Sequence, residues 1–304
     1  MKKFIIRIVL FTLFFISVDK TLLYFREKSA QLEVDNRLEK IITGKVKADL
    51  LVFGSSRGAR SVIASQISDS LDKTAYNLAF PGSDITFHSF LLELLLKNNA
   101  NQVPKQIILV VDDADELQKS KSLKFRLDRM YPLVKYKVIR DELVKRKEKK
   151  PFVNELLVSH QLNKSNFLLK QKKFTKNDSI MPCGSMPISH QKKTFDKKFG
   201  KEPYQYDVKS ELIQKINAFN HFIDLCHKNK IQLIVALPPN FRVVSNGFEK
   251  RMKHLVGNKG VVWKYNQDKA AYSDPDNFFD NAHLQKKGSI IYTADLIAYL
   301  KTMN

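Results

Sequence analysis

Short apolar runs that alternate with longer amphipathic segments constrain the fold of this chain more than any other feature. From residue 50 onward, runs rich in Val, Ile and Leu occur at 50–53, 74–80, 105–112, 231–239 and 260–265. Segments with helical spacing follow them at 59–72, 84–99, 211–229, 245–257 and 284–301. This alternation is typical of a parallel sheet covered by helices on both faces. We therefore expect an α/β domain of about five parallel strands, with any ligand bound at their carboxyl ends.

One interruption of this pattern, at about 114–205, is too long for a plain loop in a compact domain and is expected to be an inserted subdomain. The 304-residue chain has a net charge of +21, and residues 115–205 hold 23 Lys and Arg against 10 Asp and Glu, a net of +13. Two interpretations stay open: a lid that meets an anionic substrate or lipid headgroups, and a solvated Lys-rich surface. The basic runs lack interleaved aromatic residues, so nucleic acid is not an expected partner.

The N-terminus, residues 1–25, is expected to be a membrane anchor or signal segment. It reads MKKFIIRIVLFTLFFISVDKTLLYF, with an apolar stretch that continues to about Val18. No small-residue cleavage site follows, which favours an uncleaved single-pass anchor with the main domain outside the cytoplasm, in the periplasm or extracellular space. A buried amphipathic helix is the alternative. Residues 26–48 are expected to form a helical stalk that leads to a domain at 49–304.

A candidate nucleophile follows the first predicted strand. Gly54-Ser55-Ser56-Arg57-Gly58 fits the G-x-S-x-G pattern, in which a tight strand-to-helix turn presents the central serine to solvent. A phosphate-binding Walker A loop would need Gly and Lys where this chain has Ala59 and Arg60, so that interpretation is rejected.

A second motif, Asp280-Asn281-Ala282-His283, lies immediately before the last predicted helix. A nucleophilic serine needs an imidazole as base, and the imidazole needs a carboxylate on its other nitrogen. We therefore predict Ser56 as nucleophile, His283 as base and Asp280 as the residue that orients the imidazole. The α/β-hydrolase fold uses a similar turn, but there the serine follows a middle strand and the Asp is usually far from the His.

Together these segments resemble the SGNH (GDSL) hydrolase superfamily, and "DLLVFGSSR" with "YNLAFPGS" resembles its membrane-anchored bacterial branch. The resemblance covers about 49–112 and 207–302. It implies a flavodoxin-like three-layer α/β/α sandwich, with Ser56 in the Gly-Asp-Ser block and Asp280 and His283 in the Asp-x-x-His block. It also implies that Gly82 provides an N–H group that joins the Ser56 N–H in an oxyanion hole. No metal or organic cofactor is implied.

The chain departs from the family pattern at two places. Ser55 replaces the usual Asp, and "VVDDAD" presents Asp112 and Asp113 where the third family block has an Asn. Losing one oxyanion donor can lower a rate by roughly 10²–10³. Two functions therefore stay open. One is a membrane-anchored serine esterase or O-acyltransferase acting on acyl esters, such as those of a cell-envelope polysaccharide. The other is a catalytically weak or inactive protein that binds or helps assemble an envelope glycan.

The two cysteines, Cys183 and Cys226, have no metal-ligand spacing. A disulfide in an oxidising compartment and two separate thiols both stay open. Hydrolysis and transfer also stay open, because both proceed through the same acyl-enzyme. No oligomeric state is predicted.

Overall fold

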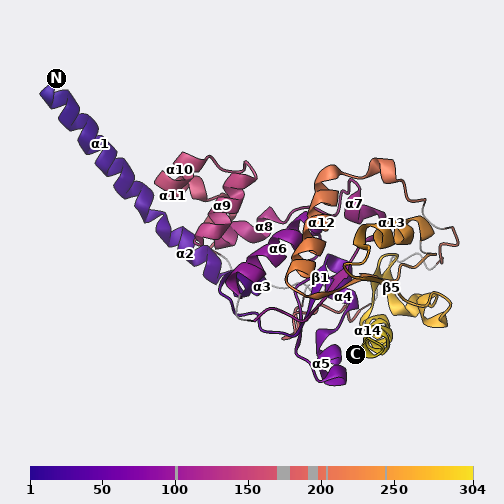
Figure 1. Ribbon diagram of the computed structural model, residues 1–304. Helices are drawn as coiled ribbons and strands as arrows, with labels where there is room; N and C mark the ends of the chain where they lie inside the picture. Colours follow the sequence, from indigo (N-terminus) through magenta and orange to yellow (C-terminus); the bar gives the residue numbers. More distant parts are fainter. Residues whose placement is uncertain (100–101, 170–178, 191–197, 203–204, 244, 304) are drawn as a thin grey trace. The chain divides into compact units, whose positions relative to one another are not determined.

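The computed structural model describes residues 1–99, 102–169, 179–190, 198–202, 205–243 and 245–303 (Figure 1). The chain divides into two compact units. The first, here called the anchor unit, comprises Met1–Glu39 and Arg126–Lys173, and the second, called the sheet unit, comprises Lys40–Phe125 and Phe174–Asn304. The long segment at 114–205 is therefore shared between the units, and its middle part groups with the N-terminal residues.

Five parallel strands form the centre of the sheet unit, as the sequence predicts. They are β1 (Leu50–Gly54), β2 (Ala75–Asn77), β3 (Gln106–Val110), β4 (Gln232–Leu237) and β5 (Val261–Lys264). Their order in the sheet is β2-β1-β3-β4-β5, and every neighbouring pair is parallel. Gly54 lies opposite Val110, which lies opposite Ala236, so β1, β3 and β4 end close to the same edge.

Helices cover both faces of this sheet (Figure 1). Leu50 and Val52 of β1 join a buried cluster with α5 (Ala64–Leu71) and α14 (Lys286–Lys301). Phe53 points to the opposite face, as strand alternation requires, and its ring centroid lies 5.4 Å from that of Phe222 in α12 (Ile213–Lys228). Helix α6 (Ile85–Asn98) packs beside α12. Because β1 and β3 are buried on both faces, their sequences are continuously apolar.

The prediction of a single helix at 59–72 is wrong, because two shorter helices occupy this region. Helix α4 (Ser56–Ser61) ends before Val62, and α5 begins after Ile63. Both residues are β-branched and adopt extended backbone angles. The side-chain amide of Asn77 donates to the Val62 carbonyl at 3.0 Å, which holds the break in place. This contact comes from another element, so the local spacing does not reveal it.

The sheet unit contains several further elements. Helix α13 contacts both α12 and β5, and a two-stranded antiparallel hairpin, β6 with β7, precedes α14. The bounds of these additional elements are α13 (Asn246–Val256), α7 (Asp113–Leu117), β6 (Phe278–Asp280), β7 (His283–Leu284), and the 3₁₀ turns Val208–Ser210, Ala270–Tyr272 and Pro275–Asn277. Helix α3 (Arg37–Ile42) lies at the junction of the two units along the chain. Cys183 and Cys226 are free thiols, so they do not pair with each other.

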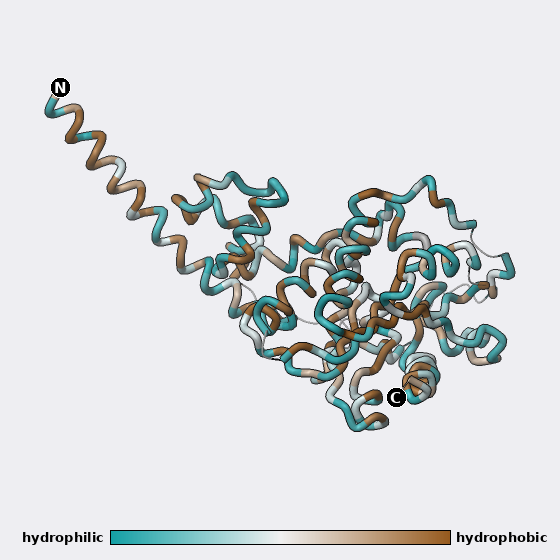
Figure 2. Tube along the Cα trace, viewed as in Figure 1, coloured by the Kyte–Doolittle hydropathy of each residue, from teal (hydrophilic) through white to brown (hydrophobic). Residues whose placement is uncertain are grey.

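The anchor unit consists of helices. They are α1 (Lys2–Thr21), α2 (Leu23–Gln31), α8 (Leu127–Met130), α9 (Lys137–Lys145), α10 (Pro151–Leu156), α11 (Val158–Gln161), and the 3₁₀ turns Tyr131–Leu133 and Lys164–Phe167. Helix α1 begins a stretch that is long and apolar enough to cross a membrane, with a mean hydropathy of 1.8 in its most apolar window. Only 6% of that window is buried, which contradicts the alternative of a buried core helix. Figure 2 shows the hydrophobic residues along α1.

Candidate active site

Ser56 is presented by a tight turn at the carboxyl end of β1, and the two flanking glycines are needed there. Gly54 has a φ of +144°, and a Cβ at this position would lie 2.6 Å from the Val110 carbonyl oxygen. A Cβ on Gly58 would lie 3.0 Å from that of Ala79. Ser56 becomes the first residue of α4 and is partly exposed at the edge where the strands end. The G-x-S-x-G pattern therefore corresponds to the strand-to-helix turn that the sequence predicts.

Asp280 and His283 come from the hairpin before α14. Asp280 lies opposite His283 in the antiparallel pair of β6 and β7. One carboxylate oxygen, Asp280 Oδ1, accepts hydrogen bonds from the backbone N–H groups of Ala282 and His283, each at 2.9 Å. The short spacing of the D-x-x-H motif thus lets the carboxylate hold its own turn closed.

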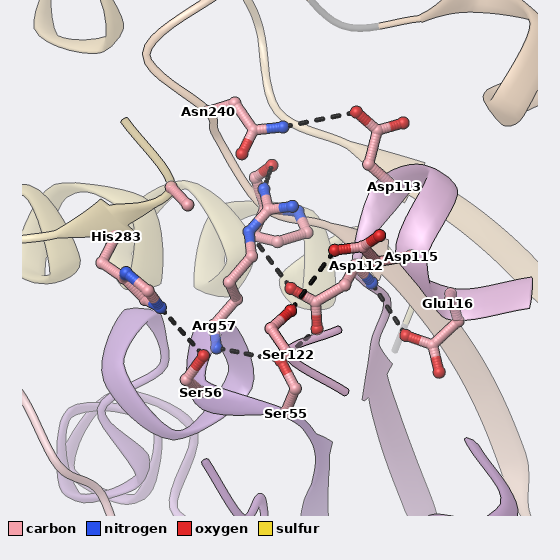
Figure 3. Close-up of polar contacts among 12 residues, drawn as sticks. Ser55, Ser56, Arg57, Asp112, Asp113, Asp115, Glu116, Ser122, Asn240 and His283 are labelled. Atoms are coloured by element: carbon pink, nitrogen blue, oxygen red, sulfur yellow. Dashed lines mark hydrogen bonds and ion pairs between the residues drawn. The ribbon is translucent and has the colours of Figure 1, made fainter. Parts of the chain in front are cut away.

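The structure brings Ser56, His283 and Asp280 together in one chain of hydrogen bonds. Figure 3 shows the contact between Ser56 and His283. Ser56 Oγ lies 2.8 Å from His283 Nε2. On the other side of the ring, His283 Nδ1 lies 2.8 Å from Asp280 Oδ1 and 3.1 Å from Oδ2. Ser56 and His283 are 227 residues apart in the sequence, so only the fold places them side by side.

The charge of Asp280 sets the direction of these hydrogen bonds. Burial disfavours its ionised form, but hydrogen bonds and the nearby charge of His283 outweigh burial and lower the pKa of Asp280 to about 2. An ionised carboxylate only accepts hydrogen bonds, so Nδ1 of the imidazole carries the proton. In the neutral ring, Nε2 then accepts the hydrogen bond that the Ser56 hydroxyl donates.

Gly82 lies in the loop after β2, and this loop is bound to the end of β1. The Phe80 N–H donates to the Gly54 carbonyl at 2.9 Å, and the Ser83 hydroxyl donates to it at 3.3 Å. Gly82 has a φ of +75°, which favours glycine. Among the residues that the structure describes, neither the Ser56 N–H nor the Gly82 N–H donates to a protein acceptor. Both donors are therefore available to a ligand.

Asp112, which stands where the family resemblance would place an Asn, faces Ser55. The Ser55 hydroxyl donates to Asp112 Oδ2, and Arg57 Nε lies 3.8 Å from Asp112 Oδ1 (Figure 3). Burial raises the pKa of Asp112, while Arg57 and Ser55 act in the opposite direction. Ser55 and Asp112, the two departures from the family pattern, are therefore partners of each other.

A buried polar network continues from Asp112 away from Ser56. The Asp112 N–H donates to Glu116 Oε2 at 2.8 Å, and Glu116 Oε1 lies 3.9 Å from His88 Nδ1. His88 Nε2 lies 2.8 Å from the Ser83 hydroxyl. Burial and the charge of Asp112 raise the pKa of Glu116 to about 8, and burial lowers the pKa of His88 to about 4. Sequence reasoning missed the role of Glu116, since no motif marks it.

A polar pocket of about 320 Å³ lies at the ends of the strands, and neither Ser56 nor His283 itself lines it. Arg57, next to Ser56 in the chain, and Ala282, next to His283, both line it. The other lining residues are charged or amide side chains, namely Asp112, Asp113, Asp115, Gln118, Lys119, Asn240 and Arg242. Arg57, Asp112, Asp113, Asp115 and Ala282 belong to motifs that the sequence analysis quotes. Gln118, Lys119, Asn240 and Arg242 belong to no recognisable motif, and sequence reasoning missed them.

Asp113 organises one wall of this pocket. Arg242 Nη2 donates to Asp113 Oδ2 at 3.0 Å. The Asn240 amide lies 3.5 Å from the same oxygen (Figure 3). Asp113 has a φ of +30°, an uncommon backbone angle for a residue with a side chain. The loop after β4 and the start of α7 are joined through this carboxylate.

No protein-family model matches this sequence, and a comparison with curated proteins finds no match. The chemistry of this site therefore follows from its geometry alone. A serine hydroxyl, an imidazole and an ionised carboxylate in this order form an arrangement suited to nucleophilic attack on a carbonyl carbon.

Proposed function

We propose that this chain is a membrane-anchored serine esterase or O-acyltransferase of the SGNH type. The observation that carries the proposal is the hydrogen-bonded chain from Ser56 through His283 to Asp280. The strand order β2-β1-β3-β4-β5 supports the same family, because flavodoxin-like sheets have this order.

In the proposed mechanism, Ser56 Oγ attacks the acyl carbonyl carbon while His283 Nε2 takes the hydroxyl proton. The N–H groups of Ser56 and Gly82 bind the negative charge that develops on the carbonyl oxygen. When the tetrahedral intermediate collapses, the ester C–O bond breaks, and His283 returns its proton to the leaving alcohol. Water or an acceptor hydroxyl then attacks the acyl-Ser56 ester by the same steps in reverse, and Ser56 is regenerated.

The pocket lined by Arg57 and Ala282, the chain neighbours of Ser56 and His283, favours a hydrophilic substrate. Its walls carry carboxylate, guanidinium and amide groups, which suit the hydroxyl groups of a sugar better than a long acyl chain. We therefore place a short acyl group near Ser56 and the carbohydrate part of a cell-envelope polysaccharide in this pocket. Helix α1 would keep the enzyme at the cell membrane, with the sheet unit outside the cytoplasm.

A second candidate function is a non-catalytic protein that binds or helps assemble an envelope glycan. The observation that favours it is Asp112, whose carboxyl group stands after β3 where the family has an amide donor. With that donor absent, two backbone N–H groups would have to stabilise the oxyanion.

Ester hydrolysis by the full-length protein in detergent, with p-nitrophenyl acetate as substrate, tests the proposed function. We expect Ser56→Ala and His283→Ala each to lower kcat by at least about 10³-fold, because each removes a group that acts in the transition state. Ser273→Ala and His221→Ala, at exposed positions of the sheet unit, are the matched controls and should leave the rate unchanged.

Labelling with a fluorophosphonate separates the two candidate functions. An active esterase is labelled at Ser56, and the label is absent in Ser56→Ala. A wild-type protein that turns over the ester while both triad variants retain full activity would exclude the triad. A wild-type protein that neither hydrolyses the ester nor takes the label would favour the glycan-binding function.

A further inference from the structure

Helix α10 of the anchor unit exposes large apolar side chains. Phe152 is 77% exposed and Leu156 is 51% exposed. They are four residues apart, so they lie on the same face of this short helix. Glu155, between them in sequence, is also exposed. Two large apolar side chains that lie together on the solvent-exposed surface of a protein indicate a contact with an apolar partner or with lipid.

Asp19 ties this helix to the end of the apolar part of α1. Its carboxylate is only 4% exposed and accepts hydrogen bonds from the Val158 N–H at 2.7 Å and the Ser159 N–H at 2.8 Å. Lys20 Nζ also donates to the Leu156 carbonyl at 3.4 Å. Because only Leu157 separates the end of α10 from Val158, these bonds fix α10 beside the point where the apolar stretch stops.

The length of the apolar stretch places that point near the bilayer boundary. From Phe4 to Val18 the helix rises about 22 Å, whereas a hydrocarbon core is about 30 Å thick. With Lys2 and Lys3 at one interface, the opposite interface therefore lies at or beyond Asp19, beside the helices bound to it. A carboxylate that accepts hydrogen bonds from two backbone N–H groups has hydrogen-bond partners at this depth without water.

Basic side chains occur close to the apolar pair in the chain. Lys147 and Lys150 shortly precede α10 in sequence and are exposed, and the exposed Lys20 donates to the Leu156 carbonyl. Lysines beside exposed Phe and Leu are typical of a helix that lies in the headgroup layer of an anionic membrane.

We propose that α10 lies on the same bilayer that α1 spans, with Phe152 and Leu156 inserted at the headgroup–acyl boundary and the neighbouring lysines on anionic lipid headgroups. The proposal rests on the membrane-anchor part of the proposed function and is independent of catalysis. This contact gives the anchor unit a fixed orientation on the membrane, which a single spanning helix alone does not provide.

Tryptophan fluorescence in vesicles tests this contact. The full-length protein is reconstituted into phosphatidylcholine vesicles with about 30 mol% phosphatidylglycerol, either without bromolipid or with lipids brominated near the top or near the end of the acyl chain. Three single variants are compared: Phe152→Trp, Phe11→Trp in the apolar stretch, and Gln31→Trp. The exposed Gln31 lies about 18 Å beyond Asp19 along the helices of the same unit. The native Trp263 is buried and common to all three.

We expect bromolipid quenching at position 152 to exceed that at position 31 by about threefold, and to fall when phosphatidylglycerol is replaced by phosphatidylcholine. Adding Asp19→Ala should also lower the quenching at position 152, because α11 loses its two acceptors. Quenching at position 11 together with equal, low quenching at positions 152 and 31 would overturn the proposal and leave the anchor intact. Absence of quenching at position 11 would overturn the anchor, and the proposal with it.

Discussion

At the scale of single residues, Asp280 has two roles that one substitution separates. It closes its own turn by accepting two backbone N–H groups, and it fixes the imidazole tautomer by accepting from His283 Nδ1. Asp280→Asn keeps an oxygen for the turn, but its amide can donate to the ring and favour the wrong tautomer. We expect kcat for ester hydrolysis to fall by about 10³–10⁴-fold with little change in stability. Asp268→Asn, at an exposed position, is the control, and equal rates for the two variants would exclude Asp280 from the mechanism.

Asp112 is expected to stabilise the sheet unit because it is a buried partner of Ser55 and Arg57. Asp112→Asn replaces one carboxylate oxygen, which accepts from the buried Ser55 hydroxyl or faces the Arg57 guanidinium group, with an NH₂ group that cannot accept a hydrogen bond. We expect the free energy of unfolding to fall by about 2 kcal/mol. Urea titration in detergent, followed by the fluorescence of Trp263 in the core of the sheet unit, measures this change.

Asp115→Asn is the matched control for Asp112→Asn. Asp115 lines the same pocket but is exposed, so its substitution should change the stability by less than about 0.5 kcal/mol. Similar effects of the two substitutions would mean that the contacts of Asp112 with Ser55 and Arg57 do not contribute to stability.

At the scale of elements, the strands of the sheet unit were predictable because each carries its own signal. Leu50–Gly54 and Gln106–Val110 are buried on both faces and therefore read as uninterrupted apolar runs. The Ser56 turn and the position of Asp280 and His283 before the last helix were also predictable, since each motif is complete within five residues. The hairpin of β6 and β7 that carries Asp280 and His283 was not predicted. The break at Val62 was not, because Asn77 holds it from another element.

The network behind Asp112 was unpredictable for the same reason. It joins the end of β3, helix α7 and helix α6, and its members are adjacent only in the fold. Arg242 and Asn240 likewise reach Asp113 from a loop more than 100 residues away. Local patterns predict elements and the motifs at their ends, whereas contacts between distant side chains depend on packing that no local pattern records.

This network makes the stability of the sheet unit depend on pH through Glu116. Its pKa is about 8 in the folded protein and 4.5 in an unfolded chain, so between these values only the folded state holds the proton. Its contribution is fully present below pH 4.5 and is lost as the pH rises towards 8. Glu116→Gln, which keeps an acceptor for the Asp112 N–H, should remove this loss.

Urea titrations at intervals of about one pH unit, from about pH 5 to pH 9, measure the free energy of unfolding of wild type and of Glu116→Gln. The effect is the difference between these two free energies at each pH. We expect the wild type to lose stability relative to the variant by on the order of 2–4 kcal/mol across this interval. His88, whose pKa is lowered to about 4, acts in the opposite sense below its ordinary pKa of 6.5, but it is present in both proteins. A constant difference would mean that Glu116 is ionised in the folded protein throughout.

At the scale of the whole molecule, the N-terminal segment is part of a folded unit and is also long and apolar enough to cross a membrane. The ring of Phe25 lies 5.0 Å from that of Phe167, and Arg26 donates to Gln161 at 3.0 Å. Ser29 donates to the Pro132 carbonyl at 3.1 Å and accepts from Asn166 at 2.9 Å. A segment removed by processing would take these contacts with it, so they favour the interpretation that the N-terminus is retained.

Two truncations test whether the anchor unit depends on this segment. Deleting residues 2–18 removes the apolar stretch but keeps Asp19 and α2, so residues 126–169 should remain folded. Deleting residues 2–32 also removes Asp19, Phe25 and Ser29 and leaves their partners without contacts. Because 126–169 is rich in Lys and Arg, trypsin should cut it at least about tenfold faster in the longer truncation. Cleavage within the sheet unit is the internal control and should be the same in both proteins. Equal cleavage of 126–169 in the two truncations would show that α2 is not needed for the fold of the anchor unit, and the argument for a retained N-terminus would then fail.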